Sequence, residues 1–464
     1  MVDIITASVL FALLVATIWR PPVAYSAVVV TFALEQWAQA SGAFFAQHSA
    51  LLNYLVGIIV LTALISSLAR GRKVFSTIEL VYAGIVLFLG YAVLSLAWTP
   101  DRRAAVSVMW YSAPYMVTYG LAVPLIFTEK NDFRIAIVAT AVVGCFVLPA
   151  LLLGTNIHAF GRTIETTTAV VDRYGREKSR LNPLAVASYS GVVVLAFMLG
   201  HVGKTNRLLK VLGWIVVPIG MYLIVRSGSR GQFLGTVLAG AALVKFSYPG
   251  LNLGRLFGWV FGLGLLAVTA YVAISLLPSA TVRFNVADGY ENYMGTRGQM
   301  VGHLLEAWFQ SSPMNIIFGL GVSASWFVVG YYPHVQPVEI LAELGVFGFM
   351  MAATLIIMGA WKAVQGMQLT KRDLENRGAL VAFMGFTALY FMLAFKQGSY
   401  LTNYSLFMNL AIMSKAATLW GRAKSQADLQ RRQQWMHWQQ TQVLANPALS
   451  SRAMSNNPAL PQHS

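Results

Sequence analysis

The sequence predicts an all-α fold, a polytopic membrane helical bundle of about 12 or 13 transmembrane helices with one large loop on the outer side. Of its 464 residues, 57% are hydrophobic and only 11% are charged, and the mean hydropathy is +0.62. A soluble globular protein has about 25% charged residues. The chain also repeats apolar runs near the length of about 20 residues that a helix needs to cross a bilayer. These runs are continuous rather than alternating, which argues against a transmembrane β-barrel.

The apolar segments follow one another along most of the chain. They cover residues 4–19, 22–38, 51–69, 76–97, 105–127, 134–153, 182–201, 210–226, 231–247, 255–277, 343–361, 378–395 and 400–420. The first two flank Arg20-Pro21-Pro22, where a helix must break. Two full crossings there give about 13 helices and an outer N-terminus, whereas one broken crossing gives about 12 and an inner N-terminus. We favour the single broken crossing.

Four clusters of Lys and Arg set the predicted orientation, because short loops rich in these residues stay in the cytoplasm. The clusters comprise Arg70, Arg72 and Lys73; Lys204, Arg207 and Lys210; Lys362, Lys371, Arg372 and Arg377; and the tail from Arg422 onward, with Lys424, Arg431 and Arg432. Counting crossings between the clusters leaves five stretches on the outer side, namely 98–104, 154–181, 226–231, 278–342 and 396–400.

The chain therefore divides into four parts. They are transmembrane helices with a basic outer loop at 154–181 (1–277), the large outer loop (278–342), the C-terminal transmembrane helices (343–421) and a cytoplasmic tail (422–464). The tail is rich in Gln, Ser and Asn, and we expect it to be largely disordered apart from a short amphipathic helix around 429–443. The net charge of +16 fits basic loops against anionic membrane lipid, so no nucleic-acid partner is expected.

Arginines on the predicted outer loops are the anomaly of this sequence. The loop 154–181 carries Arg180, the two-helix junction at 226–231 carries Arg226 and Arg230, and the large loop carries Arg297. Positive charge on short outer loops opposes the orientation rule, so something should offset it. Guanidinium groups bind phosphate oxygens in a planar, bidentate geometry. The arginine cluster could bind the phosphates of a polyprenyl diphosphate at the outer membrane boundary. Alternatively, these arginines are simply solvated or pair with nearby carboxylates.

Two motifs on the outer side could support chemistry. Ser227–Gly231 (SGSRG) permits a tight turn and leaves backbone N–H groups open to an anion where the next helix starts, at Arg230. His334 precedes a helix that carries Glu339 and Glu343 one turn apart. A neutral histidine can accept a proton near pH 7. Glu343 can orient such a base, pair with an arginine or simply close a buried polar contact.

The order of the motifs resembles the O-antigen ligase and polymerase superfamily of bacterial envelope proteins, over roughly residues 50–420. The stretches that carry the resemblance are Trp98–Asp101 (WTPD), Arg180–Ala187 (RLNPLAVA), Ser227–Gly231 (SGSRG), Phe318–Gly321 (FGLG), and Pro333-His334 leading into Leu341–Gly345 (LAELG). Val335-Gln336 departs from the Asn-containing start that is more usual in that family.

The resemblance implies a glycosyltransferase of the bacterial inner membrane with one large periplasmic loop. Members of that family take a glycan from undecaprenyl diphosphate and pass it to a glycan or lipid A-core acceptor. They use no nucleotide sugar or cofactor, and the ligases require no metal. Other envelope polysaccharide assembly proteins and membrane lipids are the implied further partners.

Carried over to this chain, the resemblance gives Arg230 and Arg297 the role of gripping the diphosphate, with Arg180 as a helper. His334 becomes the proton acceptor at the acceptor hydroxyl, or the group that orients it. We add Arg226 and Glu343 to the predicted substrate-binding residues.

Several functions remain open at the level of sequence. We slightly favour ligase-like transfer over polymerisation of O-antigen or exopolysaccharide repeat units, because both use the same donor and the motifs do not separate them. A transporter of polysaccharide or lipid-linked sugar would place charges near the bilayer midplane and show repeated halves. A non-catalytic scaffold would not need the arginine cluster on the outer loops.

Overall fold

The computed structural model describes residues 1–75, 78–155, 164–171, 177–250, 252, 254 and 297–445. Every predicted apolar segment is helical except 255–277, which lies outside the described residues together with 278–296, the first part of the large loop. Within the described residues, seven helices are long and apolar enough to cross a membrane: α1 (Val2–Trp19), α4 (Leu51–Ala69), α5 with η2 (Leu80–Ala97), α8 (Asp132–Leu153), α11 (Arg207–Arg226), α19 (Gln336–Leu369) and α20 (Leu374–Ala394). The all-α membrane fold is supported, and the count of 12 or 13 crossings stays a prediction.

The remaining elements are shorter or more polar. Those of the N-terminal half are η1 (Pro21–Val23), α2 (Ala24–Ser41), α3 (Ala43–Gln47), α6 (Arg102–Tyr115), the π-helix η3 (Met116–Ala122), α7 (Val123–Ile126), β1 (Ile164–Val171), β2 (Glu177–Leu181), α9 (Pro183–Leu199), α10 (Val202–Thr205) and α12 (Arg230–Ser247). Those of the C-terminal half are α16 (Gly298–Phe309), α17 (Pro313–Phe318), α18 (Ala324–Val329), η5 (Tyr400–Thr402) and α21 (Tyr404–Ala445). The two strands form an antiparallel hairpin inside the predicted outer loop 154–181.

The N-terminal 41 residues form two antiparallel helices, α1 and α2, while the number of membrane crossings in this region stays a prediction. At the start of α1, the Asp3 carboxylate accepts hydrogen bonds from the backbone N–H groups of Phe44 and Phe45, just after α2 ends. At the other end of α1, the Arg70 guanidinium donates to the Ile18 and Trp19 carbonyls. The helix breaks at the two prolines as expected, and α2 then returns to the end where α1 began.

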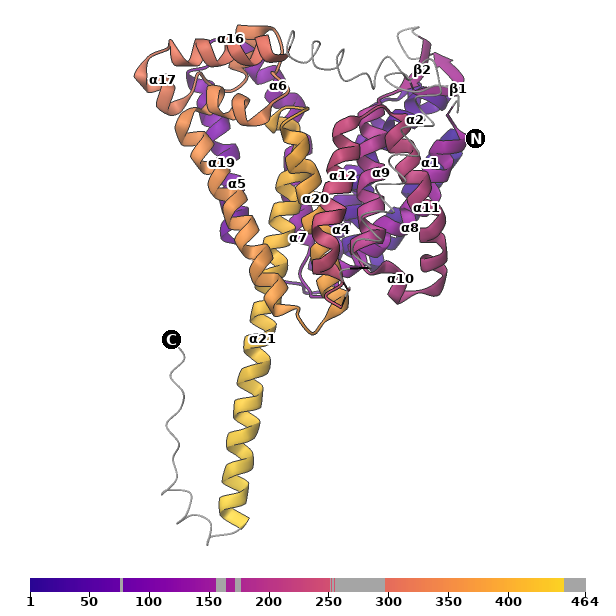
Figure 1. Cartoon of the computed structure of the whole chain (residues 1–464), viewed down its shortest axis with the longest axis vertical. Coiled ribbons are helices and arrows are strands. Elements are labelled where there is room, and N and C mark those ends of the chain that lie inside the picture. The colour runs from indigo at the N-terminus through magenta and orange to yellow at the C-terminus, as the bar shows by residue number, and fades with distance from the viewer. Residues whose placement is uncertain are drawn as a thin grey trace.

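The bundle has two chemically distinct ends, which Figure 1 separates vertically. We call the end that carries α16, α17 and the β-hairpin the loop end. The opposite end carries α10, the connection between α19 and α20, and the projecting part of α21, and we call it the basic end. The four Lys/Arg clusters lie toward the basic end, so the loops that we predict to share one side of the membrane do lie together.

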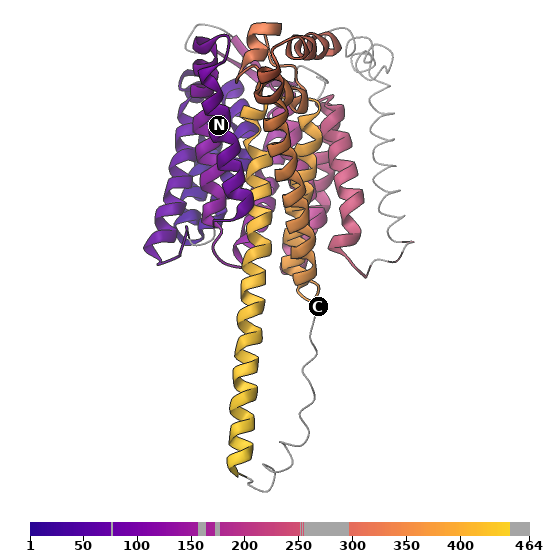
Figure 2. The same ribbon diagram turned by 90° about the vertical axis from the view of Figure 1, so that its left-hand side faces the viewer.

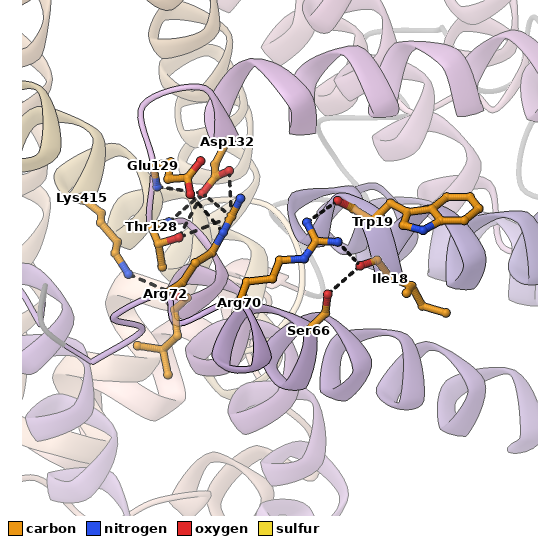
Figure 3. Close-up of polar contacts among 10 residues, drawn as sticks. Ile18, Trp19, Ser66, Arg70, Arg72, Thr128, Glu129, Asp132 and Lys415 are labelled. Atoms are coloured by element: carbon orange, nitrogen blue, oxygen red, sulfur yellow. Dashed lines mark hydrogen bonds and ion pairs between the residues drawn. The ribbon is translucent and has the colours of Figure 1, made fainter.

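At the basic end, arginines join the helices through polar contacts (Figure 3). The nearly buried Arg72 forms ion pairs with Glu129 and Asp132, with N–O distances of 3.1 and 3.3 Å. Arg70 covers the last carbonyls of α1, where a helix end has unsatisfied acceptors and a partial negative charge. The buried Lys415 of α21 donates to the Pro124 carbonyl at 3.1 Å.

The tail is more ordered than the sequence suggests. Instead of ending near residue 420, α21 continues to Ala445 and projects from the bundle as a single exposed helix (Figure 2). The prediction of a largely disordered tail is therefore wrong for 422–445, and 446–464 lie outside the described residues. The physical reason is helix propensity, because Gln, Arg, Lys and Ala are good helix formers and no Gly or Pro interrupts 422–445.

Candidate functional site

The connection between α20 and α21, Lys396–Asn403 (KQGSYLTN), is the point at which the predicted site segments meet. Gly398 has φ +71°, a backbone conformation that glycine adopts without strain, and it turns the chain back toward the bundle. The Ser399 hydroxyl then accepts from the Leu401 backbone N–H at 3.3 Å and begins the short helix η5. We refer to Lys396–Asn403 as the hub segment.

Three parts of the chain that are distant in sequence bind the hub segment. The Arg297 guanidinium donates to the Lys396 carbonyl at 3.1 Å. Gln232, in the first turn of α12, donates to the Gln397 side chain at 2.7 Å. Gln336, the first residue of α19, donates to the Gln397 carbonyl at 3.0 Å. The structure thus brings Arg297, the start of α12 that holds Arg230, and the residues after His334 to one place at the loop end.

His334 occupies a strained and partly buried position in this group. Its φ is +61°, which is uncommon for a residue with a side chain. The imidazole packs against Tyr331 and Tyr332, with ring centroids 5.3 and 4.6 Å apart. Its buried Nδ1 has no hydrogen-bond partner within the described part of the chain. Burial and, next, the positive charge of Arg297 lower the pKa of His334 from 6.5 to about 4, so the ring is neutral at pH 7.

The start of α12 is in direct contact with the Lys396 side chain of the hub segment. Gly228 has φ +63°, and the Ser227 hydroxyl accepts the Ser229 backbone N–H at 3.2 Å, which fixes the turn before Arg230. A Cβ on Gly231 would lie 3.0 Å from the Lys396 ammonium nitrogen and 2.5 Å from its Cδ. The glycine therefore lets the Lys396 side chain lie directly on the first turn of the helix.

Lys396 is the residue that the sequence reasoning missed. The segment 396–400 was expected on the outer side, but no role was assigned to it. A usable signal existed, because a lysine on a short outer loop opposes the orientation rule just as the outer arginines do. In the structure Lys396 links Arg297, through its carbonyl, with the helix that begins at Arg230, through its side chain.

A cavity of about 330 Å³ lies beside the hub segment, between α2, α6, α9 and the start of α21. Its polar lining is neutral and its apolar lining is largely aromatic. The rings belong to Phe32, Tyr111, Tyr115, Tyr189, Tyr332, Tyr390 and Tyr404, and the amides belong to Asn182, Gln336, Gln397 and Asn403. None of the six predicted site residues lines this cavity; Tyr332, Gln336 and Gln397 connect it to the group that contains His334 and Arg297.

The two carboxylates on α19 serve as anchors. Glu343 is fully buried and accepts hydrogen bonds from Ser323 N–H, Ser325 N–H, the Ser325 hydroxyl and the Tyr400 hydroxyl, at 2.6–3.1 Å. Glu339 accepts from the Ser399 hydroxyl at 2.5 Å and from the Tyr400 N–H at 3.2 Å. The sequence left three roles open for Glu343: orienting a base, pairing with an arginine, or forming a buried polar contact. The observed hydrogen bonds favour the buried polar contact.

The FGLG and LAELG motifs form one joint. Leu320 N–H and Gly321 N–H donate to the carbonyls of Ala342 and Glu343, both at 2.9 Å. The helix α19 is broken there at Gly345, whose φ is +70° and ψ −174°. A Cβ on Gly319 would lie 2.1 Å from the Glu343 carbonyl oxygen, so only glycine permits the two backbones to cross.

The WTPD motif completes this joint from α5. The Trp98 indole donates to the Gly319 carbonyl at 3.1 Å, and the Thr99 hydroxyl donates to the Val322 carbonyl at 2.8 Å. WTPD, FGLG and LAELG therefore attach the loop-end helices to the bundle, whereas His334, which precedes LAELG in the same stretch, belongs to the group around the hub segment.

The last two predicted residues lie apart from this group in different ways. Arg226 is fully buried at the end of α11 and donates to the Thr155 hydroxyl at 2.7 Å, so its charge is enclosed by protein. Arg180 is exposed on β2, where its backbone lies opposite Glu165 of β1. It precedes by two residues Asn182, a cavity-lining side chain, but is not itself in the lining.

Comparison with known proteins gives no independent assignment. No model of a known protein family matches the chain, and no curated protein matches it significantly. Among the residues that the structure describes, no group of three or more His, Cys, Asp or Glu side chains is placed to hold a metal ion.

Proposed function

We propose that this protein is a membrane glycosyltransferase that moves a glycan from a polyprenyl-diphosphate donor to an acceptor hydroxyl at the loop end. The observation that carries the proposal is the convergence on the hub segment of Arg297, Lys396, the first turn of α12 and the segment after His334. The adjoining cavity offers aromatic rings and neutral amides. Rings suit the apolar faces of a sugar, and amides suit its hydroxyls.

In this proposal the cations act on the leaving group. When the bond between the anomeric carbon and the diphosphate breaks, the electron pair leaves with the diphosphate oxygen. Arg297 and Lys396, with Arg230 at the start of α12, supply fixed positive charge for that oxygen. Preorganised charge of this kind, in a site partly shielded from water, stabilises a transition state more than it stabilises the substrate.

His334 acts on the acceptor. The acceptor oxygen forms the new bond to the anomeric carbon, and its proton passes to the neutral imidazole. In the free protein the imidazole is a weak base, because burial and Arg297 lower its pKa to about 4. A bound diphosphate would offset the charge of Arg297 and so remove the smaller of the two causes that lower the pKa of His334, while burial of the ring remains. The base would thus strengthen as the site fills.

The family resemblance and the basic end support a location in the bacterial inner membrane, with the loop end facing the periplasm. Ligase-like transfer to a glycan or lipid A-core acceptor is the version we propose, with polymerisation of repeat units as its alternative. The transporter alternative is weakened by the position of the cationic group, because Arg297, which binds the Lys396 carbonyl, precedes α16 at the loop end of the bundle rather than at its midplane.

The test uses cells that depend on this protein for a surface glycan, with variants checked for membrane level by immunoblot. We expect Arg230→Ala, Arg297→Ala and His334→Ala each to abolish transfer, and Lys396→Gln to reduce it at least about tenfold, the scale of one lost charge-assisted contact. Lys371→Gln, which removes an exposed charge at the basic end, is the matched control and should behave as wild type. Normal surface glycan in the first three variants would refute the mechanism.

A further inference from the structure

A second cavity lies on the bundle between α1 and α8, away from the hub segment. Its volume is about 640 Å³, and both helices pack against α2 and η1. Along most of its length the lining is aliphatic or aromatic, as at Val9, Ala12, Val138 and Phe146. Phe146 is 68% exposed, so the groove opens to the surroundings of the bundle.

The polar residues of this groove are concentrated at one end. Arg20 follows the last residue of α1, and Asn131 and Arg134 lie at the start of α8. This is the basic end, because Asp132 of the same turn holds Arg72. The groove therefore joins two guanidinium groups at the level of a membrane surface to an apolar channel that runs into the bundle's span.

The length of the groove matches one leaflet. Arg20, the residue after the end of α1, lies 11 positions after Val9. At a rise of about 1.5 Å per residue, this is about 17 Å. Half of a bilayer core of about 30 Å is about 15 Å. An occupant with its charged end at Arg20 would thus reach the bilayer midplane.

We propose that this groove binds an anionic phospholipid, with one acyl chain along α1 and α8 and the phosphate at Arg20 and Arg134. The charges are complementary to an anion. Arg134 forms an ion pair with Glu375, whereas Arg20 forms no ion pair within the described part of the chain, so the group keeps a net charge of +1.

An apolar peptide or a second copy of the chain fits these observations less well. Neither supplies a negative charge beside Arg20 and Arg134 together with an uncharged chain as long as one membrane leaflet is thick. The site is independent of the proposed glycan transfer, because it lies at the opposite end of the bundle from the hub segment.

The test measures binding of phosphatidylglycerol to the purified full-length protein in detergent, by native mass spectrometry and by thermal stabilisation, against phosphatidylcholine. We expect Arg20→Gln to weaken phosphatidylglycerol binding about fivefold, the effect of about one charge at a membrane surface. Ala12→Phe, which fills the groove at an exposed position, should weaken the binding of both lipids. The control Arg372→Gln removes an exposed basic-end charge outside the groove and should leave binding unchanged.

Three results would overturn the proposal. The first is equal affinity of the wild-type protein for the two lipids, which would mean that the anionic headgroup makes no specific contact with the arginines. The second is unchanged phosphatidylglycerol binding in both Arg20→Gln and Ala12→Phe. The third is a change of oligomeric state in Ala12→Phe without a change in lipid binding, which assigns the groove to a second copy of the chain.

Discussion

Substitution of Gly319 by alanine tests the joint that holds the loop-end helices on the bundle. The residue has φ +88° and ψ 169°, a region of backbone space that is essentially restricted to glycine. An added Cβ would lie 2.1 Å from the Glu343 carbonyl oxygen and 2.5 Å from the Leu344 nitrogen. Both are backbone atoms, so the clash cannot be relieved by a side-chain movement.

The expected cost has two parts. A residue other than glycine in this conformation costs of order 1–3 kcal/mol. The clash also pushes the two backbones apart, which loses the hydrogen bonds from Leu320 N–H and Gly321 N–H, at about 1 kcal/mol each. Gly319→Ala should therefore lower the free energy of unfolding by about 3–5 kcal/mol. Because the joint includes Glu343, the anchor of Tyr400, glycan transfer should fall as well.

Gly330 supplies the matched control. It also has positive φ, +75°, but nothing lies within 4 Å of an added Cβ. Gly330→Ala therefore carries the left-handed backbone cost alone, about 1–2 kcal/mol. The assays are thermal unfolding in detergent and amide hydrogen exchange of residues 320–321, whose protection should be lost in Gly319→Ala and kept in Gly330→Ala. Equal destabilisation by the two substitutions, with protection kept in both, would refute the crossing of the two backbones.

Further predictions concern separate parts of the molecule. Arg226→Leu should lower the free energy of unfolding by about 2–3 kcal/mol through loss of its charged hydrogen bond to Thr155, measured by thermal unfolding; no change would mean that the contact is dispensable. Because the pKa of His334 is lowered to about 4, kcat/KM should show no acid limb between pH 8 and 6, and a limb near pH 6.5 would contradict the burial of this ring. Because of the same lowered pKa, His334 binds more protons in the unfolded state than in the folded state between about pH 6.5 and 4, so the folded state loses stability as the pH falls through this range. His334→Gln should reduce that loss. Lys396→Arg should retain more transfer than Lys396→Gln, because it keeps the charge. A cysteine replacing Lys371 should react only with a reagent applied from the cytoplasmic side, and periplasmic labelling would reverse the proposed orientation.

The helices were predictable because a membrane helix is a local property of the sequence. A continuous apolar run needs only its own backbone hydrogen bonds and its length to be stable in lipid. The predicted segments 51–69 and 231–247 coincide with α4 and α12 to within a residue. The tail was predicted only in part, because helix propensity extends the helix well beyond the short amphipathic stretch at 429–443 that the sequence pattern indicates.

The site was predictable in part. Arg297 and Arg230 stood out because the orientation rule expects few Lys or Arg residues on short outer loops, and His334 stood out because a neutral imidazole can accept a proton near pH 7. Lys396 carried the same signal and was overlooked because its segment is short. Glu343 and Arg226 were predicted to bind substrate, but a polar residue in a loop pattern looks the same whether it faces a ligand or a buried partner. Only the four hydrogen bonds to Glu343 and the enclosure of Arg226 distinguish these cases.

By itself, the sequence determined the all-α membrane class, nearly all of the helices, and the separation of a basic end from a loop end. Each of these depends on residues within one segment or on the charge of one loop. Only the tertiary structure decided which loops meet. The contacts of the hub segment join residues 61, 99 and 165 positions apart, as in Gln336–Gln397, Arg297–Lys396 and Gln232–Gln397. Contacts at that separation follow from how the helices pack against one another, and no local pattern records that packing.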